Sequence, residues 1–133
     1  MMMVSSKGRY ALRVMMELAG RDPEQFTPLK DIATDLNLSQ KYLESIMTTL
    51  SKAGLVDALH GKGGGYRLNR PVEEYTVGSI LSLTESSMAP VSCLEGGENV
   101  CQEASGCKTL PMWTELNRIV DEYLNSVTLA SLL

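Results

Sequence analysis

The fold is decided by residues 29–68, which read LKDIATDLNLSQKYLESIMTTLSKAGLVDALHGKGGGYRL. Apolar residues at helical spacing predict one helix over Leu29–Leu36 and a second over residues 39 to about 53. A tight break at Asn37-Leu38 separates the two helices, and Ser39 is a typical N-cap for the second. Two helices joined by so short a turn form a helix-turn-helix.

A β-hairpin is predicted directly after the second helix. Leu55–His60 reads as a strand, Gly61–Gly65 as a turn, and Tyr66–Leu68 as the returning strand. Upstream, Ser6–Ala19 has helical spacing, and Thr27 followed by proline is an N-cap and first-turn signal for the helix that begins at residue 29. The order helix, helix, helix, hairpin predicts a mainly α (α+β) fold, the winged helix-turn-helix.

The rest of the chain divides into three segments. Thr76–Glu85 reads as another amphipathic helix, whereas residues 86–109 lack an apolar period and contain all three cysteines. From Leu110 a long helix begins, and its apolar residues step by three and four, as in a short coiled coil. These residues are Trp113, Leu116, Val120, Tyr123 and Val127. We therefore predict a winged helix-turn-helix DNA-binding domain over 1–85, a cysteine-bearing sensor loop over 86–109, and a dimerisation helix with a C-terminal tail over 110–133.

The charge is distributed unevenly along the 133 residues. Residues 1–70 hold ten Lys/Arg against seven Asp/Glu, while residues 71–133 hold two against nine, giving the net charge of −4. A mildly basic front half can meet phosphates if its charges share one face. No stretch approaches the roughly 20 apolar residues of a membrane span, and the charged start does not fit a signal peptide. We expect a soluble, cytoplasmic protein with no membrane partner.

Two groups of residues are candidate DNA contacts. Hydrogen-bonding side chains near the start of the second helix of the motif lie opposite its apolar stripe, where they can enter a major groove. They are Ser39, Gln40, Lys41, Tyr42, Glu44 and Ser45. In the hairpin turn, His60, Lys62 and Gly63 suit a phosphate or minor-groove contact, because glycines let backbone amides approach closely. The alternatives are a solvated helix face and a flexible hairpin tip.

No catalytic residue is predicted, and we do not expect an enzyme. A nucleotide-binding reading of Gly61-x-Gly63 would need a third glycine where Tyr66 stands, and the run lies between strands rather than at the start of a helix. The chain has no C-x-x-C motif, and its single histidine, His60, lies in the predicted hairpin. A small metal or thiol-redox protein without a DNA role is the weaker alternative.

Cys93, Cys101 and Cys107 have the spacing C-x7-C-x5-C. Structural zinc favours shorter gaps and four protein ligands, and a disulfide would leave one thiol over and is disfavoured in a reducing compartment. Thiolates in an open, glycine-containing loop can bind an iron–sulfur cluster, with another residue at the fourth position. Free surface thiols are the simpler alternative.

Five segments in the same order carry a family resemblance. They are residues 6–13 (SKGRYALR), 38–44 (LSQKYLE) and 61–66 (GKGGGY), the three-cysteine loop, and the ending SVTL at 126–129. Together they resemble, over essentially the whole chain, the iron–sulfur cluster regulator family, the winged helix-turn-helix transcription regulators of the IscR, NsrR and CymR kind.

The resemblance implies a homodimeric bacterial regulator that binds pseudo-palindromic double-stranded DNA and dimerises through its last helix. In IscR-like members three cysteines bind a two-iron–two-sulfur cluster, and Cys93, Cys101 and Cys107 match them. Ser39, Tyr42 and Glu44 match recognition-helix positions that contact DNA, and Glu44 looks like the glutamate that distinguishes classes of operator.

The chain departs from the family pattern at four places. Leu110 stands where IscR has a histidine ligand, Arg9 stands where NsrR relatives have an aspartate ligand, and the first cysteine gap is longer. His60 stands where IscR-like relatives have a wing arginine, which weakens a minor-groove contact at this position. The fourth cluster ligand therefore stays open, with an exogenous group or Glu95, Glu98, Asn99 or Glu103 as candidates. A cluster-free regulator of the CymR kind, responding through a partner protein, is the main alternative.

Overall fold

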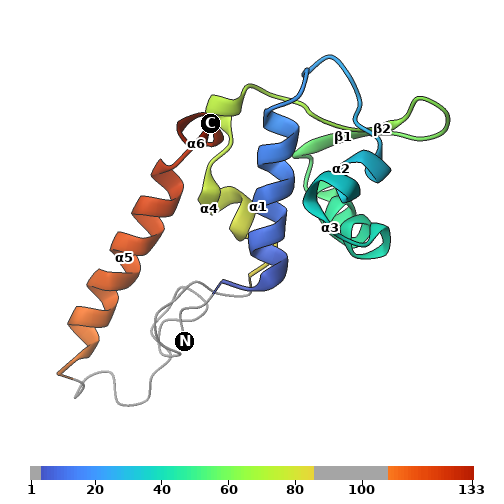
Figure 1. Ribbon diagram of the computed structural model, residues 1–133. Helices are drawn as coiled ribbons and strands as arrows, with labels where there is room; N and C mark the ends of the chain where they lie inside the picture. The colour runs from blue at the N-terminus through green and yellow to red at the C-terminus, as the bar shows by residue number, and fades with distance from the viewer. Residues whose placement is uncertain (1–3, 86–107) are drawn as a thin grey trace.

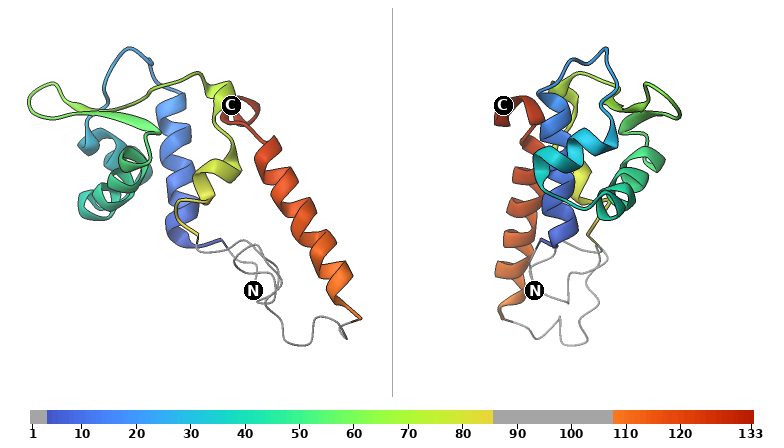
Figure 2. Two further views of the ribbon diagram at one scale, coloured as in Figure 1. Left: turned by 180° about the vertical axis from the view of Figure 1, so that it is seen from behind. Right: turned by 45° about the vertical axis from the view of Figure 1, so that its right-hand side comes forward.

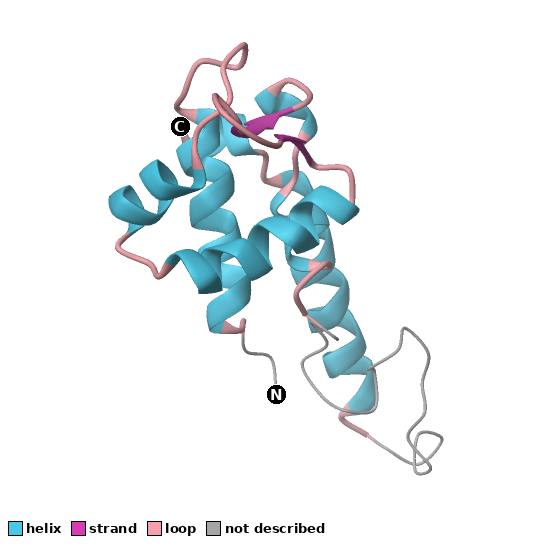
Figure 3. Cartoon of the chain, turned by 90° about the vertical axis from the view of Figure 1, so that its right-hand side faces the viewer, coloured by secondary structure: helices cyan, strands magenta, loops and turns pink. Residues whose placement is uncertain are grey.

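The computed structural model describes residues 4–85 and 108–133. Helices dominate, and two short strands form a hairpin among them (Figures 1 and 3). In chain order the elements are α1 (Ser6–Ala19), α2 (Leu29–Leu36), α3 (Gln40–Lys52), β1 (Val56–Leu59), β2 (Gly65–Leu68), the 3-10 helix η1 (Val72–Glu74), α4 (Val77–Leu81), α5 (Leu110–Ser126) and α6 (Leu129–Leu132). The predicted winged helix-turn-helix is confirmed.

The core lies where α1, α2 and α3 meet. Val14 and Met15 of α1 are completely buried, as are Ile46 and Met47 of α3 and Ile32 of α2. Burying each such side chain contributes roughly 1.5–3 kcal/mol. The bounds of these three helices agree with the periodicity, because each helix presents a single apolar stripe to this shared core.

The hairpin is the wing, and the backbone of Thr27 pairs with it as a third extended segment. β1 pairs antiparallel with β2, with Val56 opposite Leu68 and Leu59 opposite Gly65. On the other edge of β2, Thr27 N donates to Tyr66 O (2.8 Å) and Tyr66 N donates to Thr27 O (2.9 Å). The prediction that Thr27 caps α2 is wrong: Pro28 is the N-cap, and Thr27 is buried against the wing. Its backbone pairs with β2 because the wing folds back beside the start of α2.

The helix predicted over Thr76–Glu85 is shorter than expected. Thr76 caps it through its side chain, but α4 ends at Leu81. The side chains of Ser79, Ser82 and Thr84 donate to carbonyls three residues earlier, and the chain continues in tight turns. Hydroxyl groups that bond to nearby carbonyls compete with regular helix, which explains the early end.

Helix α5 leans away from the other elements and approaches them only at its Ser126 end (Figures 1 and 2). The chain then returns: Thr76 and Thr128 form an antiparallel bridge, with Val77 N donating to Val127 O at 2.8 Å. Leu129 of α6, a helix that the sequence did not predict, is completely buried in the core. The Ser126 end of α5 is therefore fastened, at both α4 and α6, to the part of the chain formed by α1 to α4 and the wing, hereafter the head.

Replacing Leu129 with alanine should lower the free energy of unfolding by about 2–3 kcal/mol, since it opens a cavity in a closed core. Leu132→Ala is the matched control, because Leu132 lies on the same helix and is 50% exposed. Urea unfolding followed by circular dichroism measures both. Equal effects of the two substitutions would mean that α6 does not dock as the structure has it.

Candidate DNA-binding surface

The turn and cap at the start of α3 have well-defined local geometry. Asn37 adopts a left-handed conformation (φ 54°), which asparagine tolerates better than most residues. Ser39 is the N-cap, and its Oγ accepts from Tyr42 N at 3.1 Å. The cap leaves the hydroxyl proton of Ser39 available to a ligand, because the bond uses only the oxygen lone pair. The start of α3 therefore presents this hydroxyl beside the positive end of the helix dipole.

Helix α3 has a buried face and an exposed polar face. The buried face consists of Leu43, Ile46, Met47 and Leu50. The exposed face carries most of the residues that the sequence assigns to DNA contact, namely Gln40, Lys41, Glu44 and Ser45, together with Thr48. The predicted separation of the two faces is confirmed, and the exposed face can accommodate a ligand as large as DNA.

The exposed face is richer in acceptors than in donors. Ser45 Oγ donates to Tyr42 O and Thr48 Oγ1 donates to Glu44 O, both at 2.8 Å. Because these hydroxyl protons are used within the helix, the two side chains offer lone pairs to a ligand. Within the described chain the Glu44 carboxylate has no hydrogen-bond partner, so it is free to accept from a donor such as the amino group of cytosine.

Tyr42 differs from its neighbours because it is half-buried. Its ring meets the ring of Tyr10 edge to face, with 5.8 Å between centroids and 89° between planes. The guanidinium of Arg13 also lies over the Tyr10 ring, 5.4 Å from its centroid. Sequence reasoning missed this contact, since no local pattern relates Tyr10 to Tyr42.

The tip of the wing holds the second group of candidate contacts. His60, Lys62 and Gly63 are all exposed there. Gly64 N donates to Gly61 O at 3.0 Å and closes the turn. Gly63 has a φ of 79°, a conformation that favours glycine. Both predicted groups therefore lie on the head, one along α3 and the other at the tip of the wing.

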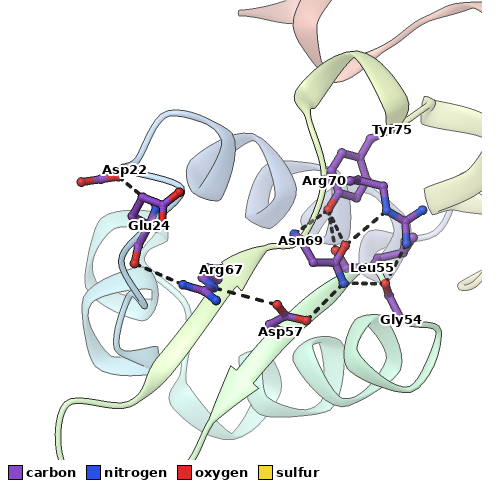
Figure 4. Close-up of polar contacts among 9 residues, drawn as sticks. All are labelled: Asp22, Glu24, Gly54, Leu55, Asp57, Arg67, Asn69, Arg70 and Tyr75. Carbon is purple, nitrogen blue, oxygen red and sulfur yellow. Dashed lines mark hydrogen bonds and ion pairs between the residues drawn. The ribbon is translucent and has the colours of Figure 1, made fainter.

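A polar network pins the base of the wing (Figure 4). Asn69 Nδ2 and Arg70 Nη2 both donate to Gly54 O, at 2.8 and 2.9 Å. Tyr75 Oη donates to Leu55 O at 2.8 Å and accepts from Asn69 N at 3.0 Å. Burial raises the pKa of the Tyr75 hydroxyl, so it stays a protonated donor. The two ends of the hairpin are thereby held together.

Two arginines of residues 1–70 make contacts within the protein. Arg67 donates to Glu24 O (3.2 Å) and lies 3.9 Å from the Asp57 carboxylate (Figure 4). Its guanidinium also lies over the ring of Phe26, 4.3 Å from the centroid. Arg21 pairs with Glu17 and Asp35. Lys41 and Lys62, by contrast, form no ion pair with any of the described residues.

The cysteines and the fourth-ligand candidates lie outside the described residues. These are Cys93, Cys101, Cys107, Glu95, Glu98, Asn99 and Glu103. Residues 4–85 and 108–133 hold no group of three or more His, Cys, Asp or Glu side chains that could bind a metal ion. Within the same residues, every helix is too short or too polar to cross a bilayer.

The apolar side chains of α5 are only partly covered: in the predicted stripe Trp113, Leu116, Val120 and Val127 are half-buried and Tyr123 is exposed. No residue of α5 is buried, and Met112, Ile119 and Tyr123 are 54%, 49% and 65% exposed. Arg118 bridges Glu115 (3.0 Å) and Glu122 on the same helix. Large exposed apolar groups beside a polar rim mark a surface that a partner covers.

Comparisons with known proteins agree with this geometry. Residues 4–133 match the model of the Rrf2 family, described as an iron-dependent transcriptional regulator. The transcriptional regulator IscR of Serratia proteamaculans is 36% identical over 131 residues, which are 98% of this chain and 79% of IscR. IscR of Vibrio campbellii is 34% identical over 132 residues, 99% of this chain and 77% of the relative.

Two solved structures superpose closely. CymR, the global cysteine regulator of B. subtilis, gives a TM-score of 0.81 at 38% identity, covering 99% of this chain and 96% of CymR. T. potens IscR gives 0.74 at 32% identity, covering 98% and 85%. The predicted resemblance is confirmed: the chain belongs to the Rrf2 family and is a DNA-binding transcriptional regulator of the IscR, NsrR and CymR type.

Proposed function

We propose that the protein acts as a homodimer whose two heads bind a pseudo-palindromic operator, each through α3 and the wing. The observation that carries this proposal is the exposed polar face of α3 beside a wing that is bonded to the start of α2 through Thr27. Because helix-turn-helix and wing are joined by backbone hydrogen bonds, they meet DNA as one unit. Two such units fit half-sites about 34 Å apart, or a multiple of that spacing.

Each proposed contact residue has a distinct role. Glu44 accepts from a base amino group in the major groove, and Gln40 and Ser45 complete the base-edge contacts. Ser39, Lys41 and the hydroxyl of Tyr42 bind backbone phosphates at the start of α3. At the wing tip Lys62 and the amide of Gly63 bind phosphates, and His60 takes the position next to the minor groove.

The apolar stripe of α5 is the proposed dimer contact. Three large exposed apolar residues of α5 are Met112, Ile119 and Tyr123. They are separated by seven and then four residues, so they share one side of the helix. A second copy of α5 would bury this stripe in the manner of a short coiled coil. Because Leu129 is buried in the core of the head, the end of α5 is attached to the same core as α3. A change at the dimer contact can therefore alter the position of α3.

Cys93, Cys101 and Cys107 would hold an iron–sulfur cluster, and three thiolates fit three of its four protein ligand positions. Leu110 has no ligand atom, and the cationic guanidinium of Arg9 has no free lone pair for iron, so the fourth position falls to another donor. When bound, the cluster supplies a centre that responds to oxidation state and iron supply. The relatives named IscR and the iron-dependent description of the family support this assignment.

Purification without oxygen tests the cluster directly. We expect brown protein that contains iron and acid-labile sulfide, and whose operator affinity differs from that of the apo-protein. Cys93→Ala should lose both the colour and the difference in affinity, while the neighbouring Ser92→Ala should keep both. Cluster-loaded protein and apo-protein that bind every operator equally would contradict the proposed switch.

A cluster-free regulator of the CymR kind is the second candidate, favoured by the TM-score of 0.81 and 38% identity to CymR and by the two missing ligand residues. Such a protein would respond through a partner protein. It predicts colourless protein even after iron and sulfide are supplied, and unchanged operator binding when all three cysteines are replaced by alanine.

A further inference from the structure

The start of α1 is fastened to the segment that follows α4. Ser5 is the N-cap of α1, and its Oγ accepts from Gly8 N at 3.0 Å. The same hydroxyl donates to Glu85 Oε2 at 2.8 Å, and Ser5 N donates to Glu85 Oε1. Residues 80 positions apart in the chain are thus joined by two hydrogen bonds.

Gly8 allows this close contact. A Cβ at position 8 would lie 2.9 Å from Thr84 Oγ1 and 3.0 Å from Glu85 Oε1. These distances are shorter than ordinary contacts, so a larger residue would push the end of this segment away from α1. The first turn of α1 therefore has a fixed position relative to Glu85.

The first two turns of α1 also contact α3, the helix proposed to enter the major groove. Tyr10 meets Tyr42 edge to face at 5.8 Å, and Lys7 Nζ donates to Thr49 Oγ1 at 3.3 Å. Tyr42 follows the N-cap of α3 by three residues, and Thr49 lies two turns further along. Hence α1 contacts α3 on both sides of Glu44, the residue proposed to read a base.

We propose that Tyr10 is a positioning residue for DNA recognition, and that the Glu85–Ser5 contact holds the part of α1 that carries it. Tyr10 lies about 7.5 Å along the helix axis from Ser5, at 1.5 Å per residue. If the Ser5 cap is lost, the first turn of α1 frays toward Tyr10. Tyr42 then loses the ring that fixes its side chain. This inference rests on the proposed DNA-binding role of Tyr42.

A double-mutant cycle tests the proposal. The probe is a 30-base-pair duplex that the wild-type protein selects from a random-sequence pool. Tyr10→Leu should weaken binding about two- to tenfold, the value of one aromatic pair. In a Tyr42→Leu background the same substitution should have no further effect. Tyr10→Phe keeps the ring, and the Tyr10 hydroxyl has no hydrogen-bond partner in the described chain, so this variant should bind like the wild type.

Two further measurements separate positioning from direct contact and from misfolding. The slope of log affinity against log salt should be the same for Tyr10→Leu and the wild type, because the substitution removes no cationic side chain that neutralises a phosphate. Glu85→Ala should weaken binding in the wild-type background but not in the Tyr10→Leu background, and it leaves the core untouched. Circular dichroism confirms that each variant is folded.

Additive effects of Tyr10→Leu and Tyr42→Leu, or a reduced salt slope for Tyr10→Leu, would overturn the inference while the DNA-binding function stands. If Tyr10→Leu fails to fold, the decision passes to Glu85→Ala, whose effect should then disappear in the Tyr42→Leu background. If the wild-type protein selects no duplex at all, the proposed function and this inference fall together.

Discussion

Replacement of both Tyr42 and Lys62 by alanine is expected to weaken operator binding about 100-fold. The double variant loses one phosphate contact at the start of α3 and one at the wing tip, and a hydrogen bond to a charged group contributes roughly 1.5 kcal/mol or more. Loss of the lysine should also reduce the salt slope by about one. Fluorescence anisotropy with a labelled operator duplex, titrated at several salt concentrations, measures both quantities.

Lys52→Ala is the matched control for charge, since Lys52 is exposed in the last turn of α3. It removes the same positive charge at the end of the helix opposite to Tyr42, so its effect should be small. The wild-type slope itself should be modest, because several arginines of the head are bound within the protein. Unchanged retention of the double variant on DNA would place the contact surface elsewhere on the molecule.

Gly65→Ala is expected to lower the free energy of unfolding by at least about 3 kcal/mol, the largest effect on stability that we predict. Gly65 has a φ of 151°, and a Cβ there would lie 2.1 Å from the carbonyl oxygen of Thr27. That oxygen accepts from Tyr66 N, so it cannot move without breaking the bond between wing and helix-turn-helix. The wing would have to separate from the start of α2.

Gly63→Ala is the control in the same hairpin. Gly63 also has a positive φ, of 79°, but nothing lies within 4 Å of the added Cβ. Its cost is therefore the backbone term alone, roughly 1–2 kcal/mol. Urea unfolding compares the two variants, and operator affinity reports the wing. If both variants lost the same stability, close packing of Gly65 on Thr27 would not be what holds the wing.

The paired backbone of Thr27 and Tyr66 also links the two groups of proposed DNA contacts to each other. The wing tip carries Lys62. The helix that starts beside the wing, α2, ends at the turn of Asn37, and the cap at Ser39 follows. A change in the wing is therefore felt at the helix-turn-helix through two hydrogen bonds. Contacts to an operator through α3 and through the wing should consequently depend on each other.

The amino-acid sequence by itself determined the features that depend on neighbours in the chain. The bounds of α1 and α2, the tight break at Asn37-Leu38, and the Ser39 cap all follow from helical spacing and side-chain chemistry within a few residues. The exposed face of α3 follows as well, because one apolar stripe leaves only one other face. The spacing of the three cysteines is also a feature of neighbouring residues, so it can be read directly from the sequence.

Only the tertiary structure decided which distant residues meet. Thr27 resembles a helix cap, yet it pairs with Tyr66; Glu85 reaches back to Ser5; and Thr128 returns to Thr76. Tyr10 and Tyr42 also belong to this group. For each of these residues, the neighbouring sequence favours no single distant partner over the others. The choice among them depends on how the helices pack around the shared core, which determines where each backbone and side-chain group is brought within bonding distance.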